Sequence, residues 1–180
     1  MTALSNVQIK KPLTIHHQPI HLFILLALVI ALTLILPPLT EAAPGGLASG
    51  KVRAPAANVE VEILESSSDY VNHIYLVSPG PEIFIGTDDD TGAVVALPPV
   101  SPGIELVFEI RVFETDGTDT GLRWQSGPPG RNDDHSWHVQ LAQPAAGEIL
   151  VSFEDLPASA WGVPNEPNYV DAIFVVREAS

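Results

Sequence analysis

The sequence contains no cysteine, and this absence removes several kinds of site at once. Without thiols there can be no disulfide, no zinc–thiolate centre and no cysteine nucleophile. The chain also lacks an N-x-[ST] glycosylation sequon, a G-x-S-x-G elbow, a Walker loop and a Rossmann glycine fingerprint. Because none of these catalytic motifs is present, the sequence predicts a protein that is not an enzyme.

Positive charge is scarce as well. The 180 residues include eight Lys and Arg against 22 Asp and Glu, which gives a formal net charge of −14 at pH 7. Such a surface repels nucleic acid and anionic lipid, so we expect no nucleic-acid partner. The many carboxylates offer oxygen ligands for cations, although a solvated acidic exterior is the commoner explanation for this composition.

Long hydrophobic runs are absent apart from one near the N-terminus, at residues 22–36. Basic residues precede this run and small residues follow it, so residues 1–42 are predicted to be a secretory signal peptide with an apolar helix. Cleavage is expected after Ala42, and an uncleaved signal anchor is the alternative. The run is short for the ~20 residues of a membrane span. We therefore expect a secreted, periplasmic or cell-surface protein that contacts the membrane only if the signal is retained.

The rest of the chain divides into a linker and one domain. Residues 43–57 are rich in Pro, Gly and Ala, which predicts a flexible linker. Over residues 58–180, short apolar alternations are separated by Gly/Pro turns, without a long helical period. This pattern predicts an all-β domain, a two-sheet antiparallel sandwich that is jelly-roll-like and has about nine strands. The expected strands are 59–64, 70–77, 82–85, 93–97, 104–113, 122–125, 137–141, 148–153 and 169–176.

Two D-T-G triplets, at Asp90 and at Asp119, have the sequence of the paired loops in aspartic proteases. Both follow polar residues rather than apolar strands, so we interpret them as solvated turns. They are also weak candidates for cation loops, because neither has the distal Glu of an EF-hand. His135 and His138 begin a predicted strand and point to opposite faces, so we expect His138 to cap or pack in the sheet rather than bind a metal.

The three tryptophans offer a second kind of site. Aromatic faces at the rim of a sandwich can stack on sugar rings, whereas core packing is the more common use of tryptophan. Trp161 lies in a predicted loop and is the best candidate for ligand binding, with Trp124 as the second. Under this interpretation the partner would be an extracellular glycan.

Acidic residues stand at the ends of the last two predicted strands. Glu154 and Asp155 directly follow the strand 148–153, and Asp171 lies within the strand 169–176, near its start. A loop that brings these ends together would gather their carboxylates. Two outcomes are open: the carboxylates bind a cation, or they accept hydrogen bonds from backbone N–H groups and hold the two strands in register.

This C-terminal pattern resembles the DUF 4114 family of secreted bacterial domains. Phe153-Glu154-Asp155-Leu156 matches its F-E-D-L motif in full, and residues 166–171 match its D-x-D-Y-N-D motif loosely. The strand at 104–108, the turn at 124–128 and His138 also look similar. The resemblance covers roughly residues 58–178.

The resemblance implies an extracellular β-sandwich module that binds calcium. The calcium ligands it implies in this sequence are Glu154, Asp155, Asn168 and Asp171. The second motif departs from the family pattern, because Glu166 and Asn168 stand in place of Asp and Val170 in place of Asn. We therefore expect an exported, non-enzymatic binding or surface-interaction module, stabilised by calcium at its C-terminal loop. Its partner would be an extracellular protein or glycan, and a carbohydrate-binding domain that uses Trp161 and Trp124 is the alternative.

Overall fold

The computed structural model of the chain describes residues 47–162 and 166–180. Within this part the chain is all β, with ten strands and three short 3₁₀ turns, η1 (Leu47–Ser49), η2 (Pro129–Arg131) and η3 (Ala158–Ala160). The predicted signal peptide, its apolar helix and the first residues of the predicted linker lie outside the described residues. Among the described residues there is no helix of the length and apolarity needed to cross a membrane.

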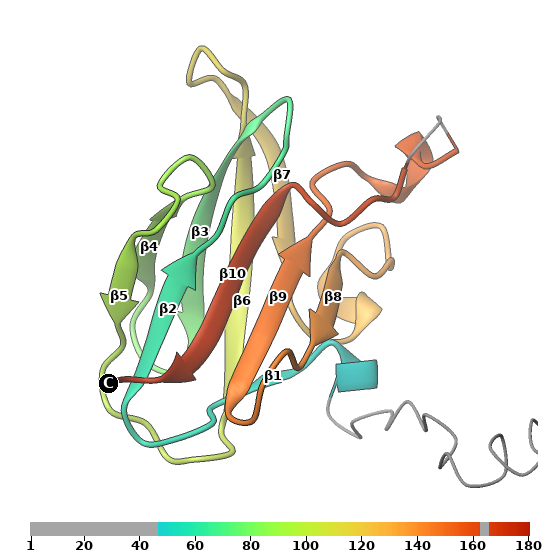
Figure 1. Cartoon of the computed structure of the whole chain (residues 1–180). Helices are drawn as coiled ribbons and strands as arrows, with labels where there is room; N and C mark the ends of the chain where they lie inside the picture. The colour runs from blue at the N-terminus through green and yellow to red at the C-terminus, as the bar shows by residue number, and fades with distance from the viewer. Residues whose placement is uncertain (1–46, 163–165) are drawn as a thin grey trace, which may run out of the picture. The chain divides into compact units, whose positions relative to one another are not determined.

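The strands form two antiparallel sheets, which stack face to face (Figure 1). One sheet has the order β1-β6-β3-β4, and β7 also pairs with β6. The other has the order β5-β2-β10-β9-β8. The first sheet contains β1 (Val52–Arg53), β3 (Val71–Ser78), β4 (Ile83–Thr87), β6 (Glu105–Phe113) and β7 (Asp119–Gln125); the second contains β2 (Val59–Ile63), β5 (Val94–Ala96), β8 (Val139–Ala142), β9 (Glu148–Phe153) and β10 (Ala172–Glu178).

The core lies between the sheets and follows from the period-two pattern of the sequence. In β2 the three apolar residues are buried, while Glu60 and Glu62 lie outside and pair with Arg177 of β10. Phe108 of β6 and Phe174 of β10 meet across the two sheets, with ring centroids 4.9 Å apart. In β6 the residues predicted to face the core between 106 and 112 are buried, but Val107 and Glu109 between them are buried as well, so the predicted alternation is confirmed only in part. The two-sheet antiparallel architecture is confirmed.

The predicted flexible linker needs correction. Val52 and Ala54 are buried in the core, and Val52 pairs with Leu106 of β6. The ordered domain therefore includes residues 47–57 of the segment expected to be a tether. A strand of two residues is too short to show an alternating pattern, which is why composition alone pointed to a linker.

The predicted jelly-roll connectivity is also wrong. A jelly roll sends successive strands to opposite sheets, whereas here the neighbouring pairs β3–β4, β6–β7, β8–β9 and β9–β10 each lie within one sheet. The connections at 79–82, 114–118 and 143–147 are short turns. Packed sheets are ~10 Å apart, and such turns favour hairpins over crossings between sheets. Strands that are not consecutive in the sequence also pair, since β2 pairs with β10 and β3 with β6.

Candidate metal site

The pairing of β9 with β10 brings the three predicted carboxylates together. Ala172 at the start of β10 lies opposite Phe153 at the end of β9. The backbone N–H of Asp171 donates to the carbonyl of Phe153 at 3.2 Å, which continues the ladder by one residue. Glu154 and Asp155 follow Phe153 directly, so both lie beside Asp171 at the same end of the sheet.

Glu154, Asp155 and Asp171 form a compact buried triad. Each offers one carboxylate oxygen, and these oxygens lie within 4.8 Å of one another. Calcium–oxygen distances are about 2.3–2.6 Å, so oxygens around one ion are separated by up to roughly 5 Å. No Lys or Arg of the described residues forms a salt bridge with any member of the triad. The triad could therefore hold a metal ion.

The electrostatics of the triad oppose full ionisation of its acids. The pKa of Asp171 is raised to about 8, first by burial and then by the negative charge of Asp155. Burial also raises the pKa of Asp155, although hydrogen bonds from Ser68 and Asn72 act in the opposite direction. A cation at this point would favour the ionised forms, because its charge reverses the local balance.

Backbone groups hold two of the three carboxylates in place. Glu154 Oε2 accepts from the N–H of Asn168 at 2.9 Å, and its Oε1 accepts from the N–H of Leu156 at 3.2 Å. Asp171 Oδ2 accepts from the N–H of Asp155 at 3.0 Å. The backbone hydrogen bonds expected under the alternative hypothesis are thus present for Glu154, whereas the Asp155 carboxylate accepts from the side chains of Ser68 and Asn72. They use some of the carboxylate oxygens and orient the others, so they are compatible with a bound cation.

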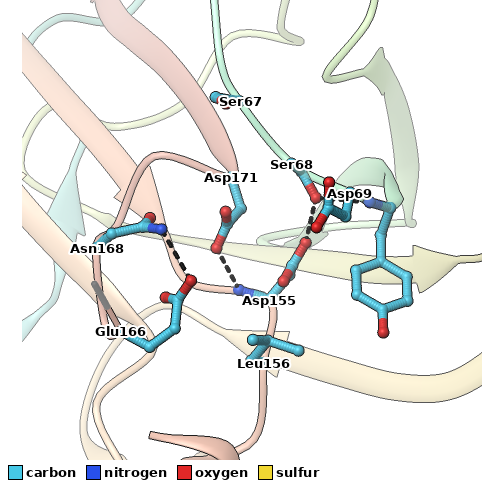
Figure 2. A pocket seen from close by; sticks show the side chains of 9 residues that line it. Ser67, Ser68, Asp69, Asp155, Leu156, Glu166, Asn168 and Asp171 are labelled. Atoms are coloured by element: carbon cyan, nitrogen blue, oxygen red, sulfur yellow. Dashed lines mark hydrogen bonds between the residues drawn. The ribbon is translucent and has the colours of Figure 1, made fainter. Parts of the chain in front are cut away.

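A pocket of about 190 Å³ opens onto Asp155 and Asp171, whereas Glu154 is fully buried and does not line it. Figure 2 shows Glu166, Asn168 and Asp171 on one side of it and Ser68, with its hydrogen bond to Asp155, on the other. Polar side chains dominate its wall. The lining residues are Ser67, Ser68, Asp69, Tyr70, Asp155, Leu156, Glu166, Asn168 and Asp171. Since a water molecule occupies about 30 Å³ in the liquid, this pocket has room for several.

Glu166 adds a fourth carboxylate at the edge of the triad. Its Oε1 accepts from Asn168 Nδ2 at 3.1 Å, whereas its Oε2 is buried and has no hydrogen-bond partner among the described residues. Partial burial and the adjacent Glu154 carboxylate raise the pKa of Glu166. A buried carboxylate oxygen without a donor is unfavourable, and a proton or a cation would relieve it.

Asn168, the fourth predicted ligand, lines the pocket with its side-chain oxygen already engaged. Asn168 Oδ1 accepts from the N–H of Val170 at 3.0 Å, as in an Asx turn. The side chain is exposed, and its contribution to the triad is the backbone N–H donated to Glu154. The next residue, Tyr169, has a positive φ of 55°, which is uncommon for a residue with a side chain.

Asn72 and its partners were missed by the sequence analysis. The Asn72 side chain is fully buried, and its Nδ2 lies 3.0 Å from Asp155 Oδ2 and 3.1 Å from Asp88 Oδ2. Asp88, two residues before the Asp90 triplet that was interpreted as a solvated turn, is itself buried and accepts from the N–H of Asn72 at 2.9 Å. The available signal was a polar residue on the core-facing side of β3, in phase with Ile74.

Trp124 is not available for ligand binding, so that prediction is wrong. Its side chain is only 3% exposed, and its ring stacks on His138 with centroids 3.7 Å apart. Trp124 Nε1 donates to the carbonyl of Asp155 at 2.6 Å, so the indole helps to fix the backbone of one triad residue. A core-facing position in β7, next to the buried His138, explains why no face is left for a sugar.

Trp161 and His138 also pack against residues 154–156, which follow β9. Trp161 is partly buried, and its Nε1 donates to the carbonyl of Leu156 at 3.1 Å. His138 is buried and contacts the carbonyl of Glu154 and the carboxylate of Asp134, which confirms that it packs in the fold. Sugar binding by Trp161 stays a prediction.

In comparisons with known proteins, the chain matches no family model, no curated protein and no solved structure. The resemblance to the DUF 4114 family likewise stays a prediction.

Proposed function

We propose that this protein is an exported, non-enzymatic binding or surface-interaction module, and that a calcium ion bound by Glu154, Asp155 and Asp171 holds its C-terminal segment. The observation that carries the proposal is the convergence of three buried carboxylates within 4.8 Å, without a salt bridge to Lys or Arg of the described residues. Export rests on the signal-like N-terminus of the sequence.

Calcium suits this site better than zinc or magnesium. The ligands are hard carboxylate oxygens, and Glu166 and pocket water can raise the coordination towards the six to eight oxygens that calcium takes. Zinc prefers sulfur and imidazole ligands, and both ring nitrogens of His138 already have partners. Magnesium requires near-ideal octahedral geometry at shorter distances, which a site built from two chain segments provides less readily.

The arrangement of the carboxylates also supports a non-catalytic role. In a glycosidase, two carboxylates face each other across the substrate at separations of about 5 Å or more. Here the three carboxylates lie at the same end of the β9–β10 pair and are buried, so they present no open face to a sugar ring. Such an arrangement favours binding one small cation.

Thermal unfolding with and without calcium tests the proposal. An ion bound to the native state at 100 times its Kd adds about 2.7 kcal/mol, which for a domain of this size raises Tm by roughly 5–10 °C. Asp171→Asn should abolish this shift. Asp116→Asn is the matched control, because Asp116 lies in an exposed turn and accepts only from Thr118. An unchanged Tm of the wild-type protein in millimolar calcium would contradict the proposal.

A further inference from the structure

The strand β8 lies at an edge of its sheet, and one side of its backbone is free. In Figure 1 it ends the order β5-β2-β10-β9-β8, with β9 as its neighbour. The N–H of Glu154 donates to the carbonyl of His138 at 3.0 Å, which continues the β8–β9 ladder by one residue. Since hydrogen-bonded and non-hydrogen-bonded pairs alternate in an antiparallel ladder, Gln140 bonds to β9, while Val139 and Leu141 turn their N–H and C=O groups outward. Among the described residues, no hydrogen bond reaches these outward groups.

A hollow of about 470 Å³ lies beside this free edge. The residues described around it include Leu47, Trp137, Leu141 and Tyr169, and no Asp, Glu, Lys or Arg. The C=O of Trp137 accepts from the Tyr169 hydroxyl at 3.0 Å, so the free stretch of backbone begins after Trp137. The Trp137 side chain itself is 39% exposed. The edge is thus open and uncharged, although the chain has a net charge of −14.

The other edge strands of the described residues carry features that discourage pairing with a further strand. The pairings of β4 with β3 and of β7 with β6 each contain a register shift, and β7 also carries the Asp119–Arg123 salt bridge. The strand β1 has two residues and β5 has three, and Pro98 and Pro99 follow soon after β5. Short strands, charges, prolines and bulges are the devices by which proteins block edge pairing. By contrast, β8 has four residues, regular pairing with β9, and no proline or charged residue, so it is the edge best suited to accept a strand.

The chemistry of this edge selects its partner. A row of N–H and C=O groups at strand spacing is matched by another extended polypeptide, whereas a sugar or an inorganic ion cannot satisfy the whole row. Within β8, the buried Val139 and the partly buried Leu141 face the core, and Gln140 is exposed on the other face. This order is self-complementary, because in an antiparallel pair centred on Gln140 apolar side chains meet apolar side chains and amide meets amide. The pairing brings no charged residues of β8 together, so the acidity of the chain does not oppose it locally.

We propose that β8 pairs antiparallel with β8 of a second copy of this chain, across a two-fold axis at Gln140, and thereby joins the two copies of its sheet. In this register Val139 lies opposite the partner's Leu141, and Leu141 opposite the partner's Val139, so that all the outward N–H and C=O groups find partners. The partner's Gln143 then comes opposite Trp137 and covers part of its exposed ring. The inference goes beyond the proposed function and uses neither its cation nor the triad.

Disulfide cross-linking of single-cysteine variants tests the inference, because the chain has no cysteine of its own. In the proposed register Gln140 and the partner's Gln140 form a non-hydrogen-bonded pair, with Cα atoms about 4.5 Å apart, which a disulfide can span. Under oxidising conditions, Gln140→Cys should run mainly as a dimer in non-reducing electrophoresis. Gln143→Cys is the matched control, since it replaces an exposed glutamine three positions away. The register separates the two copies of residue 143 by roughly 20 Å, so this variant should remain a monomer on the gel.

A charge at the axis provides the second variant. Gln140→Lys sets two like charges directly opposite each other and should weaken dimerisation roughly fivefold or more in sedimentation equilibrium, whereas Gln143→Lys, with the same change in net charge, should not. A wild-type protein that is monomeric at every concentration, equal cross-linking at positions 140 and 143, or equal dimerisation of the two Lys variants would each overturn the inference. The calcium-induced Tm shift, measured on the same variants, keeps the two proposals apart. A shift in a monomeric protein removes only the dimer, and a dimer without a shift removes only the cation.

Discussion

At the scale of single residues, Asp171 decides how the triad responds to pH. Its pKa is raised from 3.8 to about 8, so near neutral pH the metal-free protein keeps a proton that the unfolded chain has lost. The folded state then binds more protons than the unfolded state, and the free energy of unfolding falls as pH rises between about 4 and 8. Calcium requires the ionised carboxylate and competes with this proton.

The resulting prediction concerns the free energy of unfolding between pH 5 and pH 8. Without calcium, stability should fall with rising pH, by at most about 1.4 kcal/mol per pH unit for one group. With calcium in excess, the stabilisation by the ion should grow over the same range. Asp171→Asn should flatten the metal-free dependence, and urea titrations at a series of pH values measure it. A metal-free protein whose stability rises steadily from pH 5 to pH 8 would contradict the buried-acid interpretation.

Asn72 provides a second prediction at this scale. Its Nδ2 is a hydrogen-bond donor to Asp155 and Asp88, both buried. Asn72→Ala removes that donor and should lower the free energy of unfolding by about 1–3 kcal/mol, since buried acceptors lose their partner. Asn58→Ala, at an exposed position, should change stability by less than about 0.5 kcal/mol. Chemical denaturation measures both, and equal values would show that the Asn72 side chain is dispensable.

At the scale of elements, β1 shows where sequence patterns fail. The strands β2 and β6 could be predicted because Val61 and Phe108 belong to long alternations of apolar and polar residues. By contrast, β1 has two residues and lies in a Pro- and Ala-rich segment, so neither period nor composition marks it. Its place in the sheet is fixed by pairing with β6, a contact more than 50 positions away that no local pattern can reveal.

The candidate site divides in the same way. Glu154, Asp155 and Asp171 could be predicted, because acidic residues next to the facing ends of two strands must lie close together if the strands pair. Asn72 and Asp88 come from β3 and the end of β4, and their approach to Asp155 depends on the packing of one sheet on the other. Trp124 was misjudged because alternation near residue 124 does not tell which face of the strand is inside.

A substitution in β1 tests the corrected domain boundary. Val52→Ala removes two buried methyl groups, which should lower the free energy of unfolding by about 2 kcal/mol. Arg53→Ala, at the exposed neighbouring position, should have an effect of about 0.5 kcal/mol. Both values come from denaturant titration. If Val52→Ala were as stable as the wild-type protein, residues 47–57 would behave as the tether that their composition suggests.

At the scale of the whole molecule, the net charge of −14 and the signal-like N-terminus both fit the proposal of an exported protein. A strongly acidic domain stays soluble after export, and it has carboxylates available for a divalent ion where calcium is abundant. The account predicts that the exported protein begins at Ala43. Intact-mass spectrometry of protein recovered from outside the cytoplasm measures this directly, and a mass that includes Met1 and the apolar run would show that the segment is retained.

The central claim is that Glu154, Asp155 and Asp171 together bind one calcium ion. A crystal structure determined in millimolar calcium tests this claim most directly. The account predicts one ion at about 2.3–2.6 Å from an oxygen of each of the three carboxylates, with further oxygens from Glu166 or water. A well-ordered site without an ion, in which hydrogen bonds and water alone satisfy the three carboxylates, would contradict it.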